Sequence, residues 1–508
     1  MEYQVAFAVA LSAVLALFLS VEMQIHSART YPVISDSTLK ISNEDRAIEH
    51  LSEALSCKTI GNATAPKGVS DSGPFKRLHD LLEASFPQIW RQLGVEKVND
   101  YSLIFEWKGA NSTLQPGLLM SHMDVVPVAD TDVPKWSQDP FGGAVTDGFI
   151  WGRGALDVKI TLVAILEAVE ELLAAGFEPE RTLLLAFGHD EETGGTHGAK
   201  AIVRRLRERG ITQLHFVLDE GGVVLTDGFP PLTRKPVAAI GTAEKGQTTV
   251  EMSIATAGGH ASMPPLDGSS VGSIAARILS RLDRSPINPG LVAPASDMLA
   301  AFAPEAPFYL RPLLRLAHNG LFGVLLAQVM GAMSPEASAM TRTTVAVTSL
   351  EAGVAHNVLP QEGRILFNSR VLPGETCSGV VNYLNATGAA RDANRVSLRV
   401  LSAQEPSPVS DSGGPVFETI RRAILEVLPS REGEMVVVPH LVAGATDSRH
   451  YTELTEDIFR FAPLMMNKTA GDLARIHGNN ERVRTADFLK AIRFYMRFIR
   501  LAFARAGV

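Results

Sequence analysis

The chain has 508 residues, of which 46% are apolar and 20% charged, and its formal net charge is -8 at pH 7. This composition is typical of a globular protein large enough for about two or three domains. The acidic balance provides no basic surface for DNA or RNA, so no nucleic-acid partner is expected.

Residues 1–23 are predicted to be a separate module. Val5 to Val21 carries no charge and, as a helix, would span roughly 25 Å, slightly less than the ~30 Å hydrocarbon core of a bilayer. A signal peptide or a signal anchor fits this length. No basic n-region precedes the apolar run, which favours an anchor. A cleavage site ending at Ala28 would also need a small residue where the chain has His26. A polar linker is expected over 24–43.

Such an N-terminus predicts entry into the secretory pathway. The body would be membrane-anchored and face a vacuolar lumen or the outside, or alternatively it would be secreted. Four Asn-x-Ser/Thr glycosylation sequons suit this compartment: Asn62, Asn111, Asn385 and Asn467. Cys57 and Cys377 could form one disulfide there, and two free thiols fit equally well.

The region 44–242 has the alternation of strands and helices that favours an α/β domain with a central, mostly parallel sheet. Helices are expected at 44–55, 74–84 and 197–209 and around Leu162 to Leu173, and strands at 101–107, 117–120, 181–187 and 214–218. Sites in such sheets collect at the carboxyl ends of strands. Four candidate residues fall there: His122, Glu191, Glu192 and Asp219.

The acidic turn Asp190-Glu191-Glu192 ends an apolar strand and is followed by glycines. Three successive carboxylates at the end of a core strand repel one another and are costly to desolvate, so a cation would stabilise them. A solvated acidic turn is the alternative. His122 and Asp124 share a face of an extended segment, which suits a metal-bound imidazole oriented by an acid, or an ordinary structural pair. Asp157 precedes a helix and could be a simple N-cap.

From about Ala243 the pattern changes, and 243–404 is predicted to be a small α+β lid domain inserted into the first domain. Strands are expected at 248–256, 343–350, 363–371 and 395–401, with a helix at 270–282. The chain then returns to the first domain over 405–508. That part is predicted to contain a helix at 414–427, a strand at 434–438 and a terminal helix at 486–503.

Six short motifs occur along the chain: Ser121–Pro127, Gly152–Asp157, Asp190–Glu192, Leu218–Gly221, Gly258–Ser262 and Arg475–Asn480. In this order they resemble the co-catalytic zinc peptidases and amidohydrolases of the aminoacylase and carboxypeptidase S type, over roughly residues 45–505. The resemblance implies a zinc-peptidase catalytic domain made of 44–242 and 405–508, with 243–404 as a lid of the kind that can dimerise. Monomer and homodimer both occur in the family, and the lid sometimes lends its histidine to a partner's site.

The resemblance also implies two zinc ions per chain. One would be held by His122, Asp157 and Asp219, and the other by Asp157, Glu192 and His477, so that Asp157 bridges them. Glu191 would be the general base that moves a proton from the nucleophilic water to the leaving amine. Asp124 would orient the metal-bound His122.

Further residues are expected to bind the substrate. His260 of the lid resembles the residue that polarises the scissile carbonyl. Asn357, Arg370 and Arg449 resemble ligands of a substrate carboxylate, although surface salt bridges would also explain them. Members of the carboxypeptidase S type tend to have Asp-Asp-Lys where this chain has Asp157-Val158-Lys159, and the peptide after the bridging acid is usually cis in the family.

The implied reaction is hydrolysis of an amide next to a free carboxylate. A carboxypeptidase acting on peptides and an N-fatty-acyl-amino acid amidohydrolase/synthase are the two substrate hypotheses, and a catalytically silent binding scaffold is the rival. The apolar insert between Pro286 and Arg342 has three interpretations: extra packing of the lid, a wall for an acyl chain, or a surface that contacts the membrane.

Overall fold

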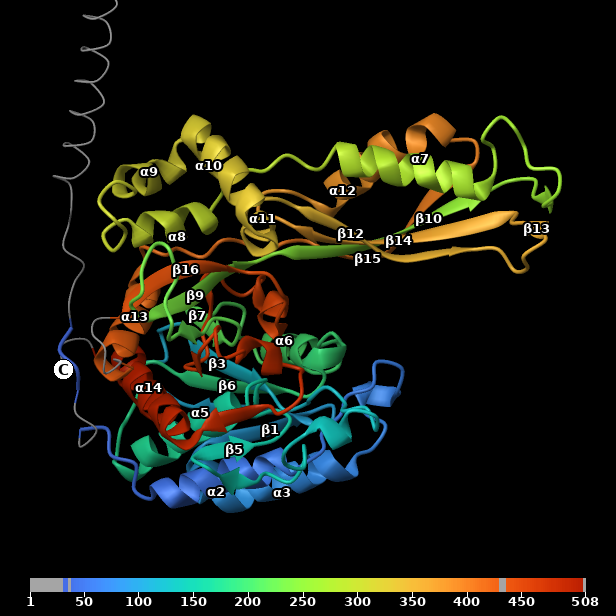
Figure 1. Ribbon diagram of the computed structural model, residues 1–508. Helices are drawn as coiled ribbons and strands as arrows, with labels where there is room; N and C mark the ends of the chain where they lie inside the picture. Colours follow the sequence, from blue (N-terminus) through green and yellow to red (C-terminus); the bar gives the residue numbers. More distant parts are fainter. Residues whose placement is uncertain (1–30, 35–37, 429–434, 506–508) are drawn as a thin grey trace, which may run out of the picture.

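The computed structural model describes residues 31–34, 38–428 and 435–505. Figure 1 shows a layered body with a long arm extending from one side. The arm holds the sheet that runs from β10 (Gly246–Ala255) to β15 (Val396–Gln404), and the body contains the segments on both sides of it in sequence. Segment 1–23, predicted to be an anchor or signal peptide, lies outside the described residues, as do residues 24–30 and 35–37 of the linker 24–43.

A ten-stranded sheet forms the middle layer of the body. Its strands are β1 (Gly94–Val98), β2 (Ser102–Trp107), β3 (Gly117–His122), β6 (Leu183–Gly188), β7 (Phe216–Asp219), β8 (Val224–Leu225), β9 (Val237–Glu244), β16 (Val436–Val442), β17 (Ile458–Arg460) and β18 (Met465–Met466). Their order is β1-β2-β6-β3-β7-β17-β9-β8-β18, with β16 paired to β9. The central strands β6, β3, β7 and β17 are parallel, which confirms the predicted sheet.

Helices cover both faces of this sheet, so β3 and β6 are buried along their whole length. One face carries α2 (Glu44–Leu55), α3 (Gly73–Ser85), α4 (Pro87–Gln92), α5 (Lys159–Ala174), α13 (Pro415–Val427) and α14 (Thr485–Phe503). The other face carries α6 (Ala199–Glu208) and the short helix η7 (Asp447–Tyr451). The apolar runs of β3 and β6 are therefore typical of parallel strands covered on two sides.

Short elements connect these layers. They include a three-stranded sheet of β4 (Val145–Thr146), β5 (Phe149–Trp151) and β19 (Arg482–Arg484), and the turns η1 (Pro66–Gly68), η2 (Val133–Lys135), η3 (Glu191–Thr193) and η8 (Leu473–Arg475). Since β5 pairs with β19, the loop after β5 lies beside the segment that precedes the terminal helix.

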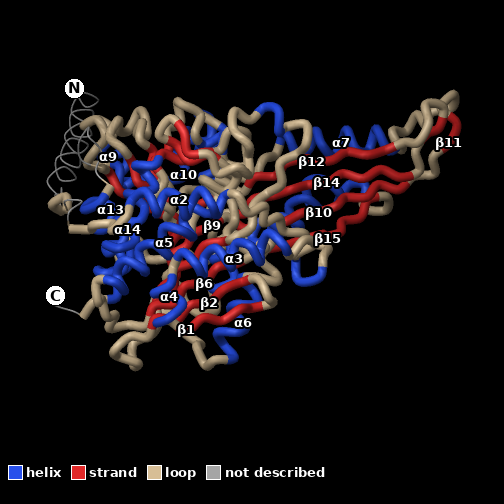
Figure 2. The backbone as a smooth tube through the Cα atoms, turned by 90° about the horizontal axis from the view of Figure 1, so that it is seen from below, coloured by secondary structure: helices blue, strands red, loops and turns tan. Residues whose placement is uncertain are grey.

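The arm is a four-stranded antiparallel sheet in the order β12-β14-β10-β15, with β12 at Thr344–Ala352 and β14 at Glu362–Val371. Helices α7 (Val271–Arg284) and α12 (Cys377–Tyr383), with the turns η5 (Leu384–Ala389) and η6 (Ala390–Asp392), cover one face. Figure 2 shows the strands running along the arm toward β11 (Gly259–His260) at its far end, where β11 pairs with β13 (Val358–Leu359) in a two-stranded sheet.

The apolar insert adds α8 (Ala295–Phe302), α9 (Arg311–Arg315), η4 (Leu316–His318), α10 (Gly320–Met333) and α11 (Pro335–Thr341). Its buried residues, among them Met298 and Phe302, form a cluster with Val237 of β9 and with Val436 and Val438 of β16. The insert thus packs against the edge of the body sheet, and the interpretation as extra packing of the lid sheet is wrong. The physical reason is that β16 has apolar side chains that α13 and α14 do not cover.

Within the described ranges, no single helix is long and apolar enough to cross a membrane. The segments Arg311–His318 and Gly320–Met333 reach that length and composition only together, and they are bent by 116° at the break between them.

Candidate metal centre and substrate cavity

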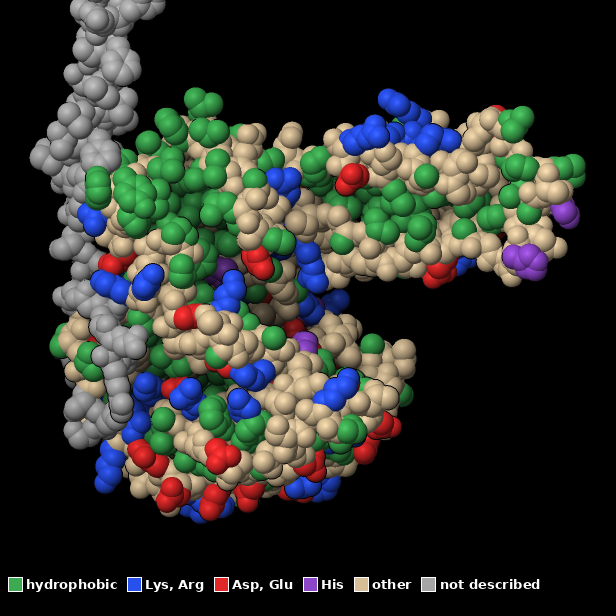
Figure 3. All heavy atoms as spheres, viewed as in Figure 1, with side chains coloured by type: hydrophobic (Ala, Val, Ile, Leu, Met, Phe, Trp, Pro, Cys, Tyr) green, Lys and Arg blue, Asp and Glu red, His purple; other side chains and the backbone are tan. Residues whose placement is uncertain are grey.

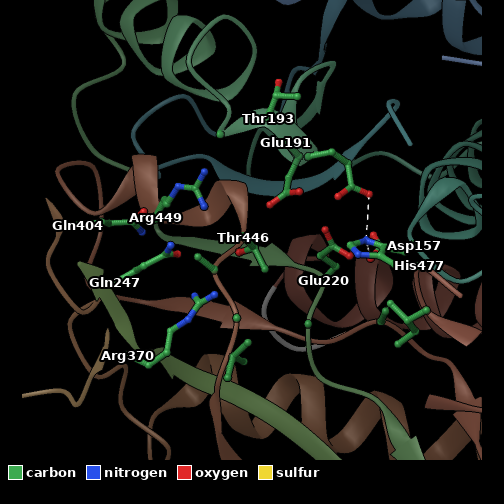
Figure 4. A pocket seen from close by; sticks show the side chains of 18 of the residues that line it. Asp157, Glu191, Thr193, Glu220, Gln247, Arg370, Gln404, Thr446, Arg449 and His477 are labelled. Atoms are coloured by element: carbon green, nitrogen blue, oxygen red, sulfur yellow. Dashed lines mark hydrogen bonds and ion pairs between the residues drawn. The ribbon is translucent and has the colours of Figure 1, made fainter. Parts of the chain in front are cut away.

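A cavity of about 920 Å³ lies at the carboxyl ends of the central strands. Figure 4 shows two opposed groups of side chains around it. The carboxylates and the imidazole come from the body: Asp157, Glu191, Glu192, Glu220 and His477. Facing them are two guanidinium and two amide groups, which belong to Arg370, Arg449, Gln247 and Gln404. The volume is in the usual range for a small-molecule site.

The first cluster of possible metal ligands consists of His122, Asp157 and Glu220. His122 Nε2 lies 3.1 Å from Asp157 Oδ1 and 3.1 Å from Glu220 Oε1. The other ring nitrogen, Nδ1, lies 3.0 Å from the backbone oxygen of Asp124, so the tautomer with a proton on Nδ1 leaves the Nε2 lone pair directed at the two carboxylates.

The structure brings Glu220, and not the predicted Asp219, to this cluster, and the assignment of Asp219 as a ligand stays a prediction. Asp219 alternates with Leu218 along β7, so it shares a face with Val217, and that face is covered by η7. Its Oδ2 accepts the backbone N–H of Ser448 at 3.0 Å. The following Gly221 has a φ of 116°, and this turn directs Glu220 into the cavity.

The second cluster consists of Asp157, Glu192 and His477. His477 Nε2 lies 2.9 Å from Asp157 Oδ2 and 3.2 Å from Glu192 Oε1. The two oxygens of Asp157 therefore face different histidines, which is the geometry of a bridging carboxylate. His477 has a φ of 58°, a left-handed conformation of the kind that clusters at functional sites.

The charges in the centre call for additional cations. Burial lowers the pKa of His122, but Glu220, Asp124 and Asp157 outweigh it and raise the pKa well above its usual value. Contacts with Asp157 and Glu192 raise the pKa of His477 to about 10. Burial, followed by Asp157, raises the pKa of Glu220 to about 8. Three carboxylates and two imidazoles converging in this way fit divalent ions that accept nitrogen and oxygen ligands.

Asp124 binds the backbone of the acidic turn Asp190–Glu192. Its two carboxylate oxygens accept the backbone N–H groups of Glu191 and Glu192, each at 3.1 Å, and Oδ1 lies 3.4 Å from His122 Nδ1. Asp124 therefore orients a ligand histidine and the turn at once. Burial, opposed by His122 and assisted by Asp447, raises the pKa of Glu191 well above its usual value. The Glu191 side chain points into the cavity between the two walls.

The two arginines on the opposite wall come from different domains, Arg370 from β14 of the arm and Arg449 from η7 of the body. Within the described ranges neither guanidinium has a carboxylate partner, and burial lowers the pKa of Arg370. Two cationic groups directed into one cavity, with no carboxylate of the described residues in ion-pair contact, could hold an anion there.

Two predicted substrate ligands are not brought to this cavity. His260 lies on β11 and Asn357 just before β13, so both belong to the exposed hairpin at the far end of the arm. His260 Nδ1 is 2.7 Å from Ser262 Oγ there. A separation along the arm, which the sequence order of the motifs does not reveal, explains this difference.

Residues 118–501 match the profile of peptidase family M20/M25/M40. The chain belongs to this family. It is therefore an enzyme of a metal-dependent family, as the motifs predicted, and both ligand clusters lie within the matched region.

Relatives in the family carry two kinds of name. Probable carboxypeptidase S-like 2 of Dictyostelium discoideum is 35% identical over 468 residues, covering 92% of this chain and 86% of the relative. The human N-fatty-acyl-amino acid synthase/hydrolase PM20D1 is 37% identical over 413 residues, covering 80% and 78%. Carboxypeptidase S of Saccharomyces cerevisiae is 31% identical over 500 residues, covering 89% and 83%. A peptidase or amidohydrolase function follows from both groups.

Solved structures share the fold. The metallo-carboxypeptidase Sso-CP2 from Sulfolobus solfataricus superposes with a TM-score of 0.64 at 19% identity, covering 90% of this chain and 98% of the other. Human carnosine dipeptidase 1 gives 0.58 at 13% identity, covering 96% and 98%. The fold is thus common to this chain and to these enzymes.

The loop of the bridging acid keeps the family conformation despite its altered sequence. The peptide between Asp157 and Val158 is cis, although a valine follows where relatives of the carboxypeptidase S type tend to have aspartate. Val158 is fully buried, so an apolar side chain suits this position. The cysteines are free and buried in different domains, Cys57 in the body and Cys377 in the arm.

Arg153 and Glu481 form a buried pair beside the cavity that no sequence motif indicated. Glu481 is fully buried and accepts the backbone N–H groups of Gly154, Leu156 and Asp157 at 3.1, 2.7 and 3.1 Å. Arg153 binds Glu481 at 2.6 Å and donates to the backbone oxygen of His477 at 3.0 Å. This pair ties the loop of the bridging acid to the loop of His477. The feature of the sequence that could have indicated this pair is Glu481, a charged residue directly after the motif Arg475–Asn480.

Proposed function

We propose that this enzyme hydrolyses the amide bond next to a free carboxylate and releases an amino acid from the end of a peptide, as a carboxypeptidase. The observation that supports this is the arrangement in Figure 4, where a possible two-metal centre and Glu191 face two arginines across one cavity. A substrate held by its carboxylate at the arginines would present the neighbouring amide to the carboxylates and imidazoles.

The metals in this proposal are two zinc ions per chain. One would be held by His122, Asp157 and Glu220, and the other by Asp157, Glu192 and His477. When bound, such ions would lower the pKa of water and polarise the amide carbonyl.

The protein's own groups would then carry the proton and position the substrate. Glu191 takes a proton from the attacking water and returns it to the nitrogen of the leaving amine. Its burial favours this role, since a raised pKa brings a carboxylate closer to the pKa of a group that must both accept and release a proton. Arg449 and Arg370 bind the carboxylate, and Asp124 keeps the turn of Glu191 in place.

The alternative substrate is an N-fatty-acyl-amino acid. Two observations favour it: the identity to the PM20D1 relatives and the apolar side chains on the cavity wall. These side chains come from the body: Leu156, Val223, Val442, Leu464 and Ile476. No described residue of the insert 286–342 lines the cavity, so the insert is not the acyl wall that the sequence suggested.

A comparison of two substrates separates these hypotheses. Hydrolysis of an N-oleoyl amino acid and of an N-blocked dipeptide would be measured with the zinc-loaded enzyme, with the C-terminally amidated dipeptide as a control. A carboxypeptidase prefers the free dipeptide, and the amidated one should be cleaved at least tenfold more slowly. Cleavage of neither substrate by enzyme that contains two zinc ions would support a catalytically silent scaffold.

Chelation tests the metals directly. Removing metal should abolish hydrolysis, and added zinc should restore it, with two ions per chain by elemental analysis. Full restoration with one ion per chain would contradict the bridged centre.

His260 is proposed to reach the active site of a second copy in a homodimer. Its position at the exposed end of the arm supports this, because the cavity of its own chain lacks it. Mixing Glu191→Gln with His260→Ala, each inactive alone, should restore part of the activity. A monomer whose own arm closes would show no restoration, and size-exclusion chromatography with light scattering would report the oligomeric state.

We also propose that the N-terminal segment anchors the enzyme in a membrane of the secretory pathway, with the body in the lumen, vacuole or extracellular space. The uncharged run Val5 to Val21 and the four sequons support this proposal. Asn385 is exposed on the arm and is the best placed of the four for a glycan. Deglycosylation of the protein from eukaryotic cells, followed by carbonate extraction of the membranes, would test both points.

A further inference from the structure

The insert exposes a large apolar surface on the body. It is formed by nine side chains between residues 308 and 333, which are Phe308, Tyr309, Leu313, Leu321, Phe322, Val324, Leu325, Val329 and Met333. Four are more than half exposed on α10 alone, with Leu321 at 81%, Leu325 at 56%, Val329 at 53% and Met333 at 65%. We call these nine residues the α9–α10 surface. In Figure 3, hydrophobic side chains gather over the part of the molecule where Figure 1 draws α9 and α10.

The sequence of α10 does not suit a helix in contact with water. Gly320–Met333 contains no charged residue, and only Gly323 and Ala327 are buried. A helix that is apolar all round is normally surrounded by protein or lipid, because its side chains gain no hydration from water. Since the described chain buries only these two residues of α10, the other faces of the helix require another apolar environment.

The shape and charge of this region fit the surface of a bilayer. The 116° bend between Arg311–His318 and Gly320–Met333 makes a crooked pair that is too short on either side to cross. Leu321, Leu325 and Val329 follow at intervals of four residues and so lie along one side of the helix. Residues 306–335 contain two arginines and no Asp or Glu, a charge balance that phospholipid headgroups accept.

The start of the described chain lies next to the insert. Tyr31 bonds to Glu418 of α13, and the N–H of Ile34 donates to the backbone oxygen of Glu426. Glu418 also lines a surface cavity together with Asp297 and Ala301 of α8. The uncharged run that we propose as an anchor ends at Val21, about ten residues before Tyr31. An extended chain of that length reaches roughly 33 Å. A bilayer that holds this anchor is therefore within reach of the insert.

We propose that the α9–α10 surface rests in the interfacial layer of a phospholipid bilayer. Its long apolar side chains enter the boundary between headgroups and acyl chains, while α8 keeps the insert attached to the body. The position of the bilayer relies on the proposed anchor, whereas the fit to lipid relies on the side chains of α10. The inference is independent of which amide the enzyme cleaves.

A local probe on the full chain tests this contact. Cys57 and Cys377 are buried, so a thiol introduced by Leu325→Cys can be labelled selectively with an environment-sensitive fluorophore. Val354→Cys, at a lid position that is 94% exposed, is the matched control. In phosphatidylcholine vesicles, we expect a blue-shifted emission at 325 and at least twofold quenching by nitroxide-labelled lipid, with neither change at 354. Leu321→Cys repeats the measurement if the first variant loses hydrolytic activity.

The other outcomes overturn the proposal. Emission at 325 that is quenched by aqueous iodide and not by nitroxide lipid would mean that the surface faces water. Shielding from both quenchers would mean that protein covers it, either a second copy or residues 5–21. Vesicle flotation of the same sample reports the anchor separately, so a chain that floats without quenching at 325 retains its anchor and has no docking surface on α10.

Discussion

The ends of β6 and β7 carry similar acidic sequences, Asp190-Glu191-Glu192 and Asp219-Glu220, and they use them in related ways. In each, the aspartate at the strand end faces the protein. Asp190 accepts the backbone N–H groups of residues 197 and 198 at 2.8 and 2.7 Å, and Asp219 accepts that of residue 448. The glutamates, which come later and are longer, reach the cavity.

The difference lies in the number of glutamates. After β6 there are two, and adjacent residues diverge, so Glu192 contacts His477 while Glu191 faces the space between the walls. After β7 there is one, and its carboxylate oxygen lies 3.1 Å from His122 Nε2. The contacts of each carboxylate thus depend on its position in the turn and on the length of its side chain, so carboxylates in similar motifs have different partners.

The largest effect on turnover is expected for substitution of Glu191, the glutamate after β6 that contacts no histidine. Glu191→Gln should lower turnover by about 10³-fold or more, because removing a general base commonly costs 10²–10⁴. The zinc content should stay at two per chain, as measured by elemental analysis beside the rate. A variant that keeps a tenth of the activity would show that Glu191 is not the base.

The two residues after β7 should differ in their effect on metal content. Glu220→Gln should release one zinc ion per chain on dialysis and lose most activity, because the cluster at His122 loses a ligand. Asp219→Asn, the matched control, should retain both ions and be affected mainly in stability. The opposite result would restore Asp219 as the ligand.

Metal binding at the cluster of Asp157, Glu192 and His477 should depend on pH. With a pKa of about 10, His477 is protonated in the metal-free protein at neutral pH and cannot ligate. Binding must expel this proton, so His477 alone should contribute up to about tenfold per pH unit to the rise in affinity between about pH 6 and 9, in addition to the protons lost from His122 and Glu220. Competition with a chelator at several pH values measures the slope. In His477→Asn the slope should fall by one proton, and an unchanged slope would assign the proton elsewhere.

The smallest effect is expected at the aspartate that faces the protein. Asp190→Asn leaves at least one of two buried backbone N–H groups at the start of α6 without its acceptor. We expect a loss of about 1–3 kcal/mol in the free energy of unfolding, measured with denaturant. Zinc content and turnover should be unchanged. Loss of zinc in this variant would give Asp190 a part in the centre and weaken the comparison of the two strand ends.

Much of the fold and the family membership was predictable, since the signals were local. The apolar runs of β3 and β6 predicted buried parallel strands, and the polar residues that follow them fell at one edge of the sheet because parallel strands end on the same side. The resemblance then assigned roles to His122, Asp157, Glu192 and His477, and the structure brings these four together.

Other features depend on contacts between distant segments. The strand β9 and the insert's attachment to β16 were not apparent, because an apolar segment does not specify which surface covers it. Likewise, the Arg153–Glu481 pair joins loops more than 300 residues apart, and no spacing in the sequence indicates it. The position of His260 at the end of the arm is also a property of the assembled sheet.

The sequence by itself determined the class of chemistry: which strands end in carboxylates and imidazoles, and that these residues resemble a two-metal hydrolase. Only the tertiary structure placed Glu220 rather than Asp219 beside His122 and Asp157, because the direction of a side chain at a strand end depends on what covers each face of the sheet. The same holds for the α9–α10 surface. Its composition is written in the sequence, and its exposure follows from how little of α10 the body can cover.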